Sequence, residues 1–374
     1  MKTSKIAKKC GLMTVGLLAI TAWSCGGEED TGPGYGNDYP NGSVLVSAQW
    51  VQHRLDTAAA GEALVIVEAG WGEAGDYYTN GHVPGAIHVN TDEIEYDCFN
   101  ARSDWPVDAG DPPCWDRSTT EEQDLAKGLG PDDSLPRNWW NLFPDQYLLP
   151  AIAHMGIDKD TTVIVYGEDL SGAARVVFAL MVAGVEKVHL LHGGYAAWTA
   201  AGFAGETTTN QRVPVASFGL STAARPELLV DTAFVQEVVA GDRSAVIADI
   251  RSHDEFVGAT APYGYIPTSG RIEGAVFAHA GEGPWDMSYF VNEDGTVKPY
   301  DAVSALWNTD GLSGEDHILF YCGTGWRAAL TFLIAHAMGW DNLSLYDGGW
   351  FEWSMGPDAA TNPVIDENPD LPAE

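Results

Sequence analysis

Four segments of this 374-residue chain occur twice, in the same order. In each copy a short apolar run ends in a tyrosine, Tyr166 or Tyr321, and a Gly-Gly pair begins 27 positions later. A tryptophan then follows at the same offset in both copies. Self-similarity of this kind indicates that the chain contains two copies of one structural unit. The matching segments are 63–69 with 245–251, 82–87 with 271–276, 163–166 with 318–321, and 193–198 with 348–353.

Each copy alternates short β-branched runs with apolar patterns of helical period, as at 163–166, 176–182 and 188–191. Such alternation is typical of a mostly parallel sheet covered by helices. We therefore expect an α/β fold with two similar domains, each a mostly parallel sheet flanked by helices. In open sheets of this class, ligands bind beyond the carboxyl ends of the strands. Residues that directly follow an apolar run are therefore the first candidates for a functional site.

The two copies differ where a ligand would bind. Cys322 follows the apolar run 318–321, whereas Gly167 occupies the matching place in the first copy. The first copy also has 81 positions between Gly85 and Tyr166, against 47 in the second copy. We therefore expect an inactive first domain that carries an insertion near 92–135, and a catalytic second domain.

The segment from Cys322 to Arg327 places a thiol, two glycines and a cation at the predicted turn from a strand into a helix over 328–337. The free amides and the positive dipole end of a helix N-terminus favour an anion, and this setting favours a thiolate. The glycines let the backbone curl so that successive amides face inward. We interpret Cys322 as a reactive nucleophile. The alternative is a buried structural cysteine that behaves as a small apolar residue.

Together these features resemble a tandem-domain rhodanese, of the thiosulfate and 3-mercaptopyruvate sulfurtransferase family. The resemblance covers 44–353 and rests on the duplication, the His-x-Pro-Gly-Ala segment that begins at His82, the Gly-Gly pairs with their tryptophans, and the cysteine loop. It implies a ping-pong reaction: Cys322 takes the outer sulfur of thiosulfate as a persulfide and passes it to cyanide or a thiol, including a protein thiol. It implies neither a metal nor an organic cofactor.

The resemblance also indicates which residues surround the sulfur. Arg327 is expected to bind the anionic donor or sulfite, and its alternative role is an ion pair with a nearby carboxylate. Family members flank the loop with an Asp-x-Arg strand end and line the cleft with a tryptophan, although a core or interface aromatic is an equal alternative for that tryptophan here. Animal members have a second arginine where Glu255 stands, so Arg271 is a candidate substitute. The residues expected to bind the donor are Gly323, Thr324, Gly325, Trp326, Arg327, Asp249, Arg251 and Trp71.

Three other functions remain open. A phosphatase related to this fold would also use a cysteine and an arginine, but it needs a wider loop than the four residues between Cys322 and Arg327. A 3-mercaptopyruvate sulfurtransferase would fit Cys-Gly-x-Gly but not the Trp326-Arg327 pair that follows it. A persulfide carrier without turnover, acting in a sulfur relay, would use the same cysteine. Thiosulfate sulfurtransferase is the favoured function.

The formal net charge of −34 restricts the partners. Such a charge disfavours nucleic acids and anionic lipid headgroups. We therefore expect no nucleic-acid partner, and a membrane contact only through a lipid anchor. The same charge repels an anionic donor, so arginines near the site are needed. The expected partners are a small-molecule sulfur donor and a thiophilic acceptor.

The N-terminal segment has the layout of a secretory signal, because four lysines precede the apolar run 11–22. That run is too short to span a bilayer. Cys25 follows in a sequence that resembles a bacterial lipobox. This predicts a signal peptide over 1–24, a lipid on Cys25, a flexible tether over 25–41 and, by family analogy for Gly26, anchoring in the outer membrane towards the periplasm or the cell surface. The alternative is an ordinary signal peptide cut near this point.

Cys98 and Cys114 both lie in the predicted insertion. In an oxidising compartment a disulfide between them is expected, and it would contribute about 3 kcal/mol. Two free thiols are the alternative. The remaining predicted boundaries are an inactive domain over 42–203, a linker over 204–222, a catalytic domain over 223–357 and an acidic tail over 358–374.

Overall fold

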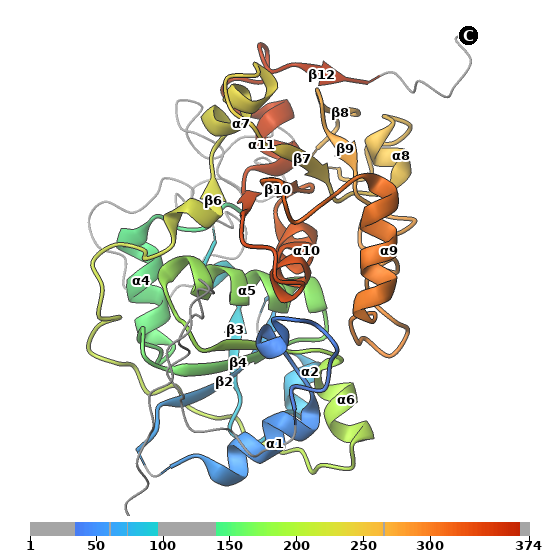
Figure 1. Ribbon diagram of the computed structural model, residues 1–374. Coiled ribbons are helices and arrows are strands. Elements are labelled where there is room, and N and C mark those ends of the chain that lie inside the picture. Colours follow the sequence, from blue (N-terminus) through green and yellow to red (C-terminus); the bar gives the residue numbers. More distant parts are fainter. Residues whose placement is uncertain (1–33, 60, 73, 96–139, 265, 367–374) are drawn as a thin grey trace, which may run out of the picture. The chain divides into compact units, whose positions relative to one another are not determined.

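Two five-stranded sheets with equivalent strand orders form the framework. The computed structural model describes residues 34–366 except 60, 73, 96–139 and 265 (Figure 1). The strand orders are β1-β5-β4-β2-β3 and β6-β11-β10-β7-β9, and every neighbouring pair within them is parallel. The predicted duplication and the α/β fold are confirmed. The strands are β1 (Leu45–Val46), β2 (Leu64–Gly70), β3 (Ile87–Asn90), β4 (Thr162–Tyr166), β5 (Val188–Leu191), β6 (Leu229–Val230), β7 (Val246–Asp249), β9 (Val276–Phe277), β10 (Ile318–Tyr321) and β11 (Leu343–Tyr346).

Helices connect the strands and cover the sheets (Figure 1). Each half has a long helix after its central strand, α5 after β4 and α10 after β10, and a short helix that begins at a Gly-Gly pair, α6 or α11. The helices are α1 (Ala48–Thr57), α2 (Asp76–Thr79), α4 (Asp145–His154), α5 (Leu170–Ala183), α6 (Gly194–Ala200), α7 (Thr232–Val239), α8 (His253–Phe256), α9 (Tyr300–Asp310), α10 (Trp326–Ala337) and α11 (Gly349–Met355), with short 3-10 turns at Gly42–Val44, Thr91–Glu93 and Pro226–Leu228.

Side-chain caps define where several of these helices begin. Asp169 accepts a hydrogen bond from the amide of Ser171 at α5, and Asp231 accepts one from the amide of Phe234 at α7. Such caps satisfy amides that have no partner within the helix. At α10 the residue before the helix is Gly325, whose side chain cannot cap. The first turn of α10 therefore keeps amides available for another acceptor.

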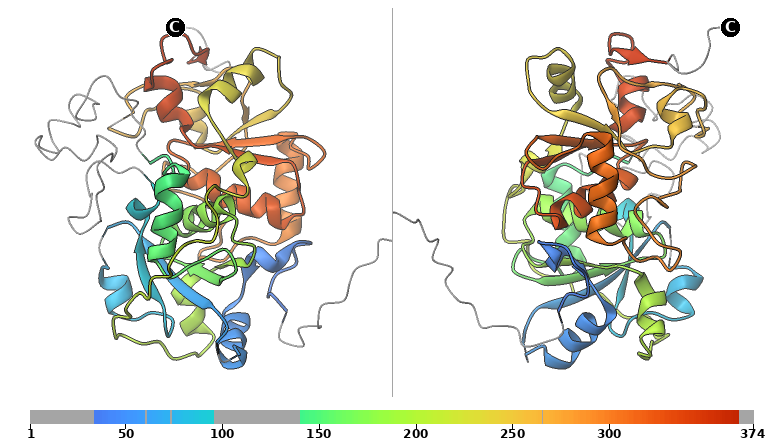
Figure 2. Two further views of the ribbon diagram at one scale, coloured as in Figure 1. Left: turned by 90° about the vertical axis from the view of Figure 1, so that its left-hand side faces the viewer. Right: turned by 45° about the vertical axis from the view of Figure 1, so that its right-hand side comes forward.

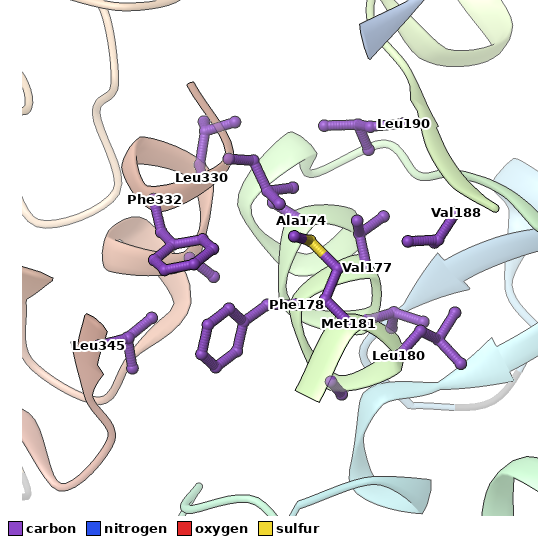
Figure 3. Packing of buried hydrophobic residues seen from close by; sticks show 14 of the residues in the cluster. Ala174, Val177, Phe178, Leu180, Met181, Val188, Leu190, Leu330, Phe332 and Leu345 are labelled. Atoms are coloured by element: carbon purple, nitrogen blue, oxygen red, sulfur yellow. The ribbon is translucent and has the colours of Figure 1, made fainter. Parts of the chain in front are cut away.

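The two long central helices, α5 and α10, pack against each other, as both views of Figure 2 show. The rings of Phe178 and Phe332 meet edge to face, with 4.9 Å between their centroids. Figure 3 shows this pair among aliphatic side chains from both halves, in one continuous core. Burial of each such side chain contributes about 1.5–3 kcal/mol. Because α10 follows the candidate nucleophile, this core holds the half that contains Cys322 against the first half.

Two predicted boundaries need correction. The tether was expected to extend to residue 41, but Tyr39 is buried and donates from its hydroxyl to the carbonyl of Lys298 at 2.7 Å. The amide of Asn41 donates to the carbonyl of Ala337 at 2.8 Å. The acidic tail was expected from 358, yet β12 (Val364–Ile365) pairs antiparallel with β8 (Arg271–Ile272). Long-range pairing of this kind leaves little trace in local composition.

Several predictions concern residues outside those that the structure describes. These are the signal segment and lipidation at Cys25, and the insertion with Cys98 and Cys114; they remain predictions. Residues 204–222 contain no helix or strand beyond a single bridge between Glu206 and His82. None of the described helices has the length and apolar character needed to cross a bilayer.

Candidate active site

Cys322 lies directly beyond the carboxyl end of β10, in the turn into α10. The residue is buried, with 2 % of its surface exposed. Its Sγ atom accepts a hydrogen bond from the amide of Gly325 at 3.2 Å. Gly325 has φ of +96°, a left-handed conformation that glycine adopts without steric cost, and its amide turns back towards the sulfur. An amide donor at this place stabilises a sulfur anion more than a thiol.

A second helix N-terminus supports the same loop from outside. The amide of Trp350 donates to the carbonyl of Cys322 at 2.7 Å, and the amide of Phe351 donates to the carbonyl of Gly323 at 3.1 Å. These amides come from the first turn of α11, where no intrahelical acceptor exists for them. The carbonyls of the loop are thereby turned towards α11. This fixes the peptide planes on both sides of Gly323.

Gly349 explains why the sequence places a Gly-Gly pair here. Its φ is +55°, and a Cβ atom would lie 2.6 Å from the carbonyl oxygen of Gly323 and 2.7 Å from that of Cys322. The first half repeats the arrangement, because a Cβ on Gly194, with φ of +54°, would lie 2.8 Å from the carbonyl oxygen of Gly167. Only glycine allows this approach in either half.

These two glycines offer a matched test. Gly349→Ala and Gly194→Ala should each lower the free energy of unfolding by about 1–3 kcal/mol, because both force a left-handed residue and a close backbone contact. Only Gly349→Ala displaces the carbonyls of Cys322 and Gly323, so only this variant should lose activity, by about 100-fold. Equal activity of the two folded variants would show that α11 does not set the loop geometry. Denaturant unfolding and sulfur-transfer rates are the measurements.

Arg327 has the carboxylate partner that the sequence left open. Its Nη1 and Nη2 each donate to Glu255 at 3.0 Å, and Nη2 also donates to the hydroxyl of Tyr263 at 2.7 Å. Burial opposes the charge on Arg327, but Tyr263, Glu255 and Cys322 outweigh it and raise the pKa of Arg327. A permanent positive charge therefore interacts with the sulfur. Binding of the donor by Arg327 remains a prediction.

The Asp249–Arg251 pair forms a buried frame beside the loop. Arg251 donates to both carboxylate oxygens of Asp249, at 2.8 and 2.6 Å, and to the carbonyl of Gly270 at 2.8 Å. Its guanidinium carbon lies 4.9 Å from the centroid of the Trp350 ring. The hydroxyl of Tyr321, the residue before Cys322, also donates to Asp249. This pair therefore connects the end of β10 to the start of α11.

The other predicted donor-binding residues lie in different surroundings. Thr324 is half-buried in the loop. Trp326 is also half-buried and donates from Nε1 to Glu95 of the first half at 2.9 Å. Trp71 is 60 % exposed at the end of β2. Arg271, the candidate substitute, donates to the carbonyl of Phe256 at 3.1 Å.

Sequence reasoning missed Tyr263 and a cluster of three buried charged residues. The ring of Tyr263 covers Gly323, since a Cβ on Gly323 would lie 3.1 Å from it. The buried cluster consists of Glu95, Arg175 and Asp347. A signal for Arg175 was present, because it is the one charged residue within the apolar helix α5. Its partners are distant in sequence, so their identity could not be inferred.

A cavity of about 460 Å³, lined by residues from both halves, lies beside Gly167, the position that corresponds to Cys322. Gly167 and Gly194 line it together with the carboxylates of Glu68, Glu168 and Asp294. A larger cavity, of about 720 Å³, has no lining contribution from Cys322. Size alone therefore does not identify the active site. Among the described residues, no group of three or more His, Cys, Asp or Glu side chains could hold a metal ion.

Comparison with known proteins agrees with this geometry. A family model for the rhodanese-like domain matches residues 47–201 and again residues 235–355. The chain belongs to the rhodanese family. The two matched regions of this rhodanese correspond to the two halves of the fold, and the second contains the cysteine loop.

Curated relatives carry the names of sulfurtransferases. Thiosulfate sulfurtransferase YnjE of Escherichia coli is 36% identical over 330 residues, which cover 87% of this chain and 66% of YnjE. A putative thiosulfate sulfurtransferase of Mycobacterium leprae is 30% identical over 312 residues, which cover 83% of this chain and 94% of the relative. The chain thus spans slightly less than two thirds of YnjE. These names place it in a family of sulfurtransferases.

Solved structures give the same family and also show diversity of substrate within it. The crystal structure of YnjE has a TM-score of 0.71 at 36% identity and covers 88% of this chain and 70% of YnjE. A structure of EanB with a cysteine persulfide and ergothioneine has a TM-score of 0.73 at 29% identity and covers 89% of this chain and 73% of EanB. An anaerobic ergothioneine biosynthesis enzyme from Chlorobium limicola, in complex with trimethyl histidine, has a TM-score of 0.72 at 30% identity and covers 89% of this chain and 72% of that enzyme.

Proposed function

We propose that this rhodanese is a thiosulfate sulfurtransferase that carries the transferred sulfur as a persulfide on Cys322. The observation that supports it best is the Gly325 amide, 3.2 Å from Sγ, in a loop whose carbonyls are held by α11. A cysteine thiolate is both a good nucleophile and a good leaving group. Arg327, which is paired with Glu255, also interacts electrostatically with the Cys322 sulfur.

The reaction proceeds in two displacements. In the first, the Cys322 thiolate attacks the outer sulfur of thiosulfate; an S–S bond forms to Cys322, and the bond to the inner sulfur breaks with its electron pair, which releases sulfite. In the second, a nucleophilic acceptor such as cyanide or a thiolate attacks the outer persulfide sulfur. That sulfur leaves with the acceptor, and the bond electrons return to the Cys322 thiolate. The Gly325 amide stabilises the cysteine sulfur when it is anionic.

A second candidate function is sulfur transfer to an organic acceptor. It is suggested by two residues of this chain that have counterparts among the residues varied in the EanB structures. Those structures include variants of a tyrosine 59 positions before the persulfide cysteine and of a threonine two positions after it. Tyr263 and Thr324 have the same separations from Cys322. Trp285, 71 % exposed, meets Tyr263 edge to face with 5.3 Å between ring centroids. An aromatic surface beside the thiol favours a planar or cationic acceptor.

A panel of donors and acceptors tests this function. The donors are thiosulfate and 3-mercaptopyruvate, and the acceptors are cyanide, a small thiol and trimethyl histidine. We expect the highest kcat/KM with thiosulfate and multiple turnover with free cyanide or thiol. Faster turnover with 3-mercaptopyruvate would reject the donor assignment. Discharge of the persulfide only to one protein partner would reject turnover and favour a carrier, and transfer to trimethyl histidine alone would favour the second candidate.

A further inference from the structure

Arg175 of the inactive half is fully buried beneath the catalytic loop of the other half. It lies in α5, where every residue from Ser171 to Ala183 is buried. Its Nε donates to Glu95 Oε2 at 2.9 Å, its Nη2 donates to the carbonyl of Trp140 at 2.5 Å, and Nη2 also lies 2.5 Å from Asp347 Oδ1. A buried guanidinium between two carboxylates is costly unless its geometry is maintained.

Two contacts connect this arginine to the loop. Glu95 uses its second oxygen, Oε1, to accept from Nε1 of Trp326 at 2.9 Å. The position of a Cβ on Gly325 would lie 3.0 Å from Arg175 Nη1 and 3.3 Å from Asp347 Oδ1. Gly325 provides the amide that contacts the Cys322 sulfur. The arginine is therefore adjacent to both residues that lead from the loop into α10.

One donor atom of Arg175, Nη1, makes no hydrogen bond within the described residues although it is buried. The ring of Trp326 closes the same region, because a Cβ on Gly172 of α5 would lie 3.2 Å from it. Both halves thus contribute to the underside of one loop. Neither Arg175 nor Glu95 belongs to the catalytic half.

We propose that Arg175 is a positioning residue for sulfur transfer: through Glu95 and Asp347 it holds Trp326 and Gly325, and so sets the amide that faces the Cys322 sulfur. The proposal rests on the proposed function of Cys322. It gives the half without a nucleophile a direct part in the active site. It also assigns a role to the unusual charge within an apolar helix.

The charge balance of the cluster makes its state depend on pH. One guanidinium faces two carboxylates. Burial raises the pKa of Glu95 to about 7, and the negative charge of Asp347 adds to this rise. The charge of Arg175 and the hydrogen bonds from Arg175 and Trp326 oppose it. Burial also raises the pKa of Asp347. Arg175 and Asp347 are the charged groups among the described residues that face Glu95 most strongly. Ionisation of Glu95 adds negative charge beneath the loop, so loading from anionic thiosulfate should slow relative to a Glu95→Gln variant as the pH rises through about 7.

The experiment uses the full chain and four variants. Arg175→Met removes the guanidinium. Trp326→Phe removes the Nε1 donor together with part of the ring that lies against Gly172. Glu95→Gln removes the charge and leaves one acceptor oxygen, which can serve Trp326 Nε1 but no longer Arg175 Nε. Arg212→Met is the control for loss of another ion pair to a buried carboxylate, since Arg212 is partly buried and pairs with the buried Glu93. Single-turnover loading with thiosulfate gives the maximal rate and the half-saturating concentration. Nuclear magnetic resonance of the Trp326 indole and the Gly325 amide reports the loop without requiring sulfur transfer.

Arg175→Met and Trp326→Phe should lower the maximal loading rate by about 10- to 100-fold. The half-saturating concentration of thiosulfate should stay within about twofold of the wild-type value. The resonance of the Gly325 amide should shift in both variants. Arg212→Met should stay within about twofold of the wild type. The Trp326 indole resonance should titrate near pH 7 in the wild type and not in Glu95→Gln. If Arg175→Met does not fold, the other two variants decide.

Folded Arg175→Met and Trp326→Phe with wild-type loading rates and unshifted Gly325 resonances would overturn the proposal. An equal loss in Arg212→Met would also overturn it, because the effect would then be general destabilisation. Failure of the proposed function is recognised separately. In that case the wild type does not load sulfur at all, whereas the resonance shifts still decide whether Arg175 positions the loop.

Discussion

Replacement of Cys322 by serine is expected to abolish sulfur transfer, with a loss of at least about 1,000-fold in turnover. A hydroxyl oxygen cannot carry the transferred sulfur as a stable intermediate, so neither displacement can take place. The fold should persist, because serine occupies a similar volume and its oxygen can also accept the hydrogen bond from the Gly325 amide. The cost in stability should be about 1–2 kcal/mol for a polar group at this buried place.

Mass spectrometry of the intact protein and of its peptides after incubation with thiosulfate checks this result directly. The wild type should gain one sulfur atom on the peptide that contains Cys322 and lose it when cyanide is added. The Cys322→Ser variant should gain none at that peptide, while its circular dichroism spectrum matches the wild type. Turnover retained in the serine variant would place the chemistry on another residue.

The sequence was sufficient to predict the framework of the site, because its determinants are local. Ile318–Tyr321 is the strand that the apolar run indicated, and α10 begins two residues before the predicted start at 328. The two Gly-Gly pairs mark the same close contact in both halves. A backbone that must approach another backbone requires glycine, so this contact is visible in the sequence even without its partner.

The partners of the buried charges could not be predicted, because tertiary packing alone brings them together. Arg327 was known to need either a donor or a carboxylate, but nothing local indicates Glu255, which lies 72 positions earlier. The same applies to Arg175 and Asp347, which come from different halves. The tether and the tail were misjudged for a related reason. Composition predicts exposure poorly where a segment pairs with a distant strand or carbonyl.

Replacement of Arg327 by methionine is expected to have the largest effect on stability. Arg327 is 4% exposed and Glu255 1%, and they share two hydrogen bonds of 3.0 Å. Methionine retains the apolar volume but leaves the Glu255 carboxylate buried without its cation. We expect a loss of about 3–5 kcal/mol in the free energy of unfolding near neutral pH. The Ser252 hydroxyl and amide continue to donate to Glu255 and limit the loss.

The pH dependence of that loss identifies its cause. Burial alone would raise the pKa of Glu255, but Arg327 outweighs it and lowers the pKa below the ordinary value of 4.5. A lowered carboxyl pKa contributes stability that is present above 4.5 and is lost as the pH falls through the folded value. Without Arg327, burial dominates, and the variant should instead gain stability as Glu255 takes up a proton. The difference between wild type and Arg327→Met, from denaturant unfolding, should therefore shrink between about pH 7 and about pH 4. A difference that stays constant or grows on acidification would mean that the methionine disturbs packing and that the ion pair with Glu255 is not what stabilises the loop.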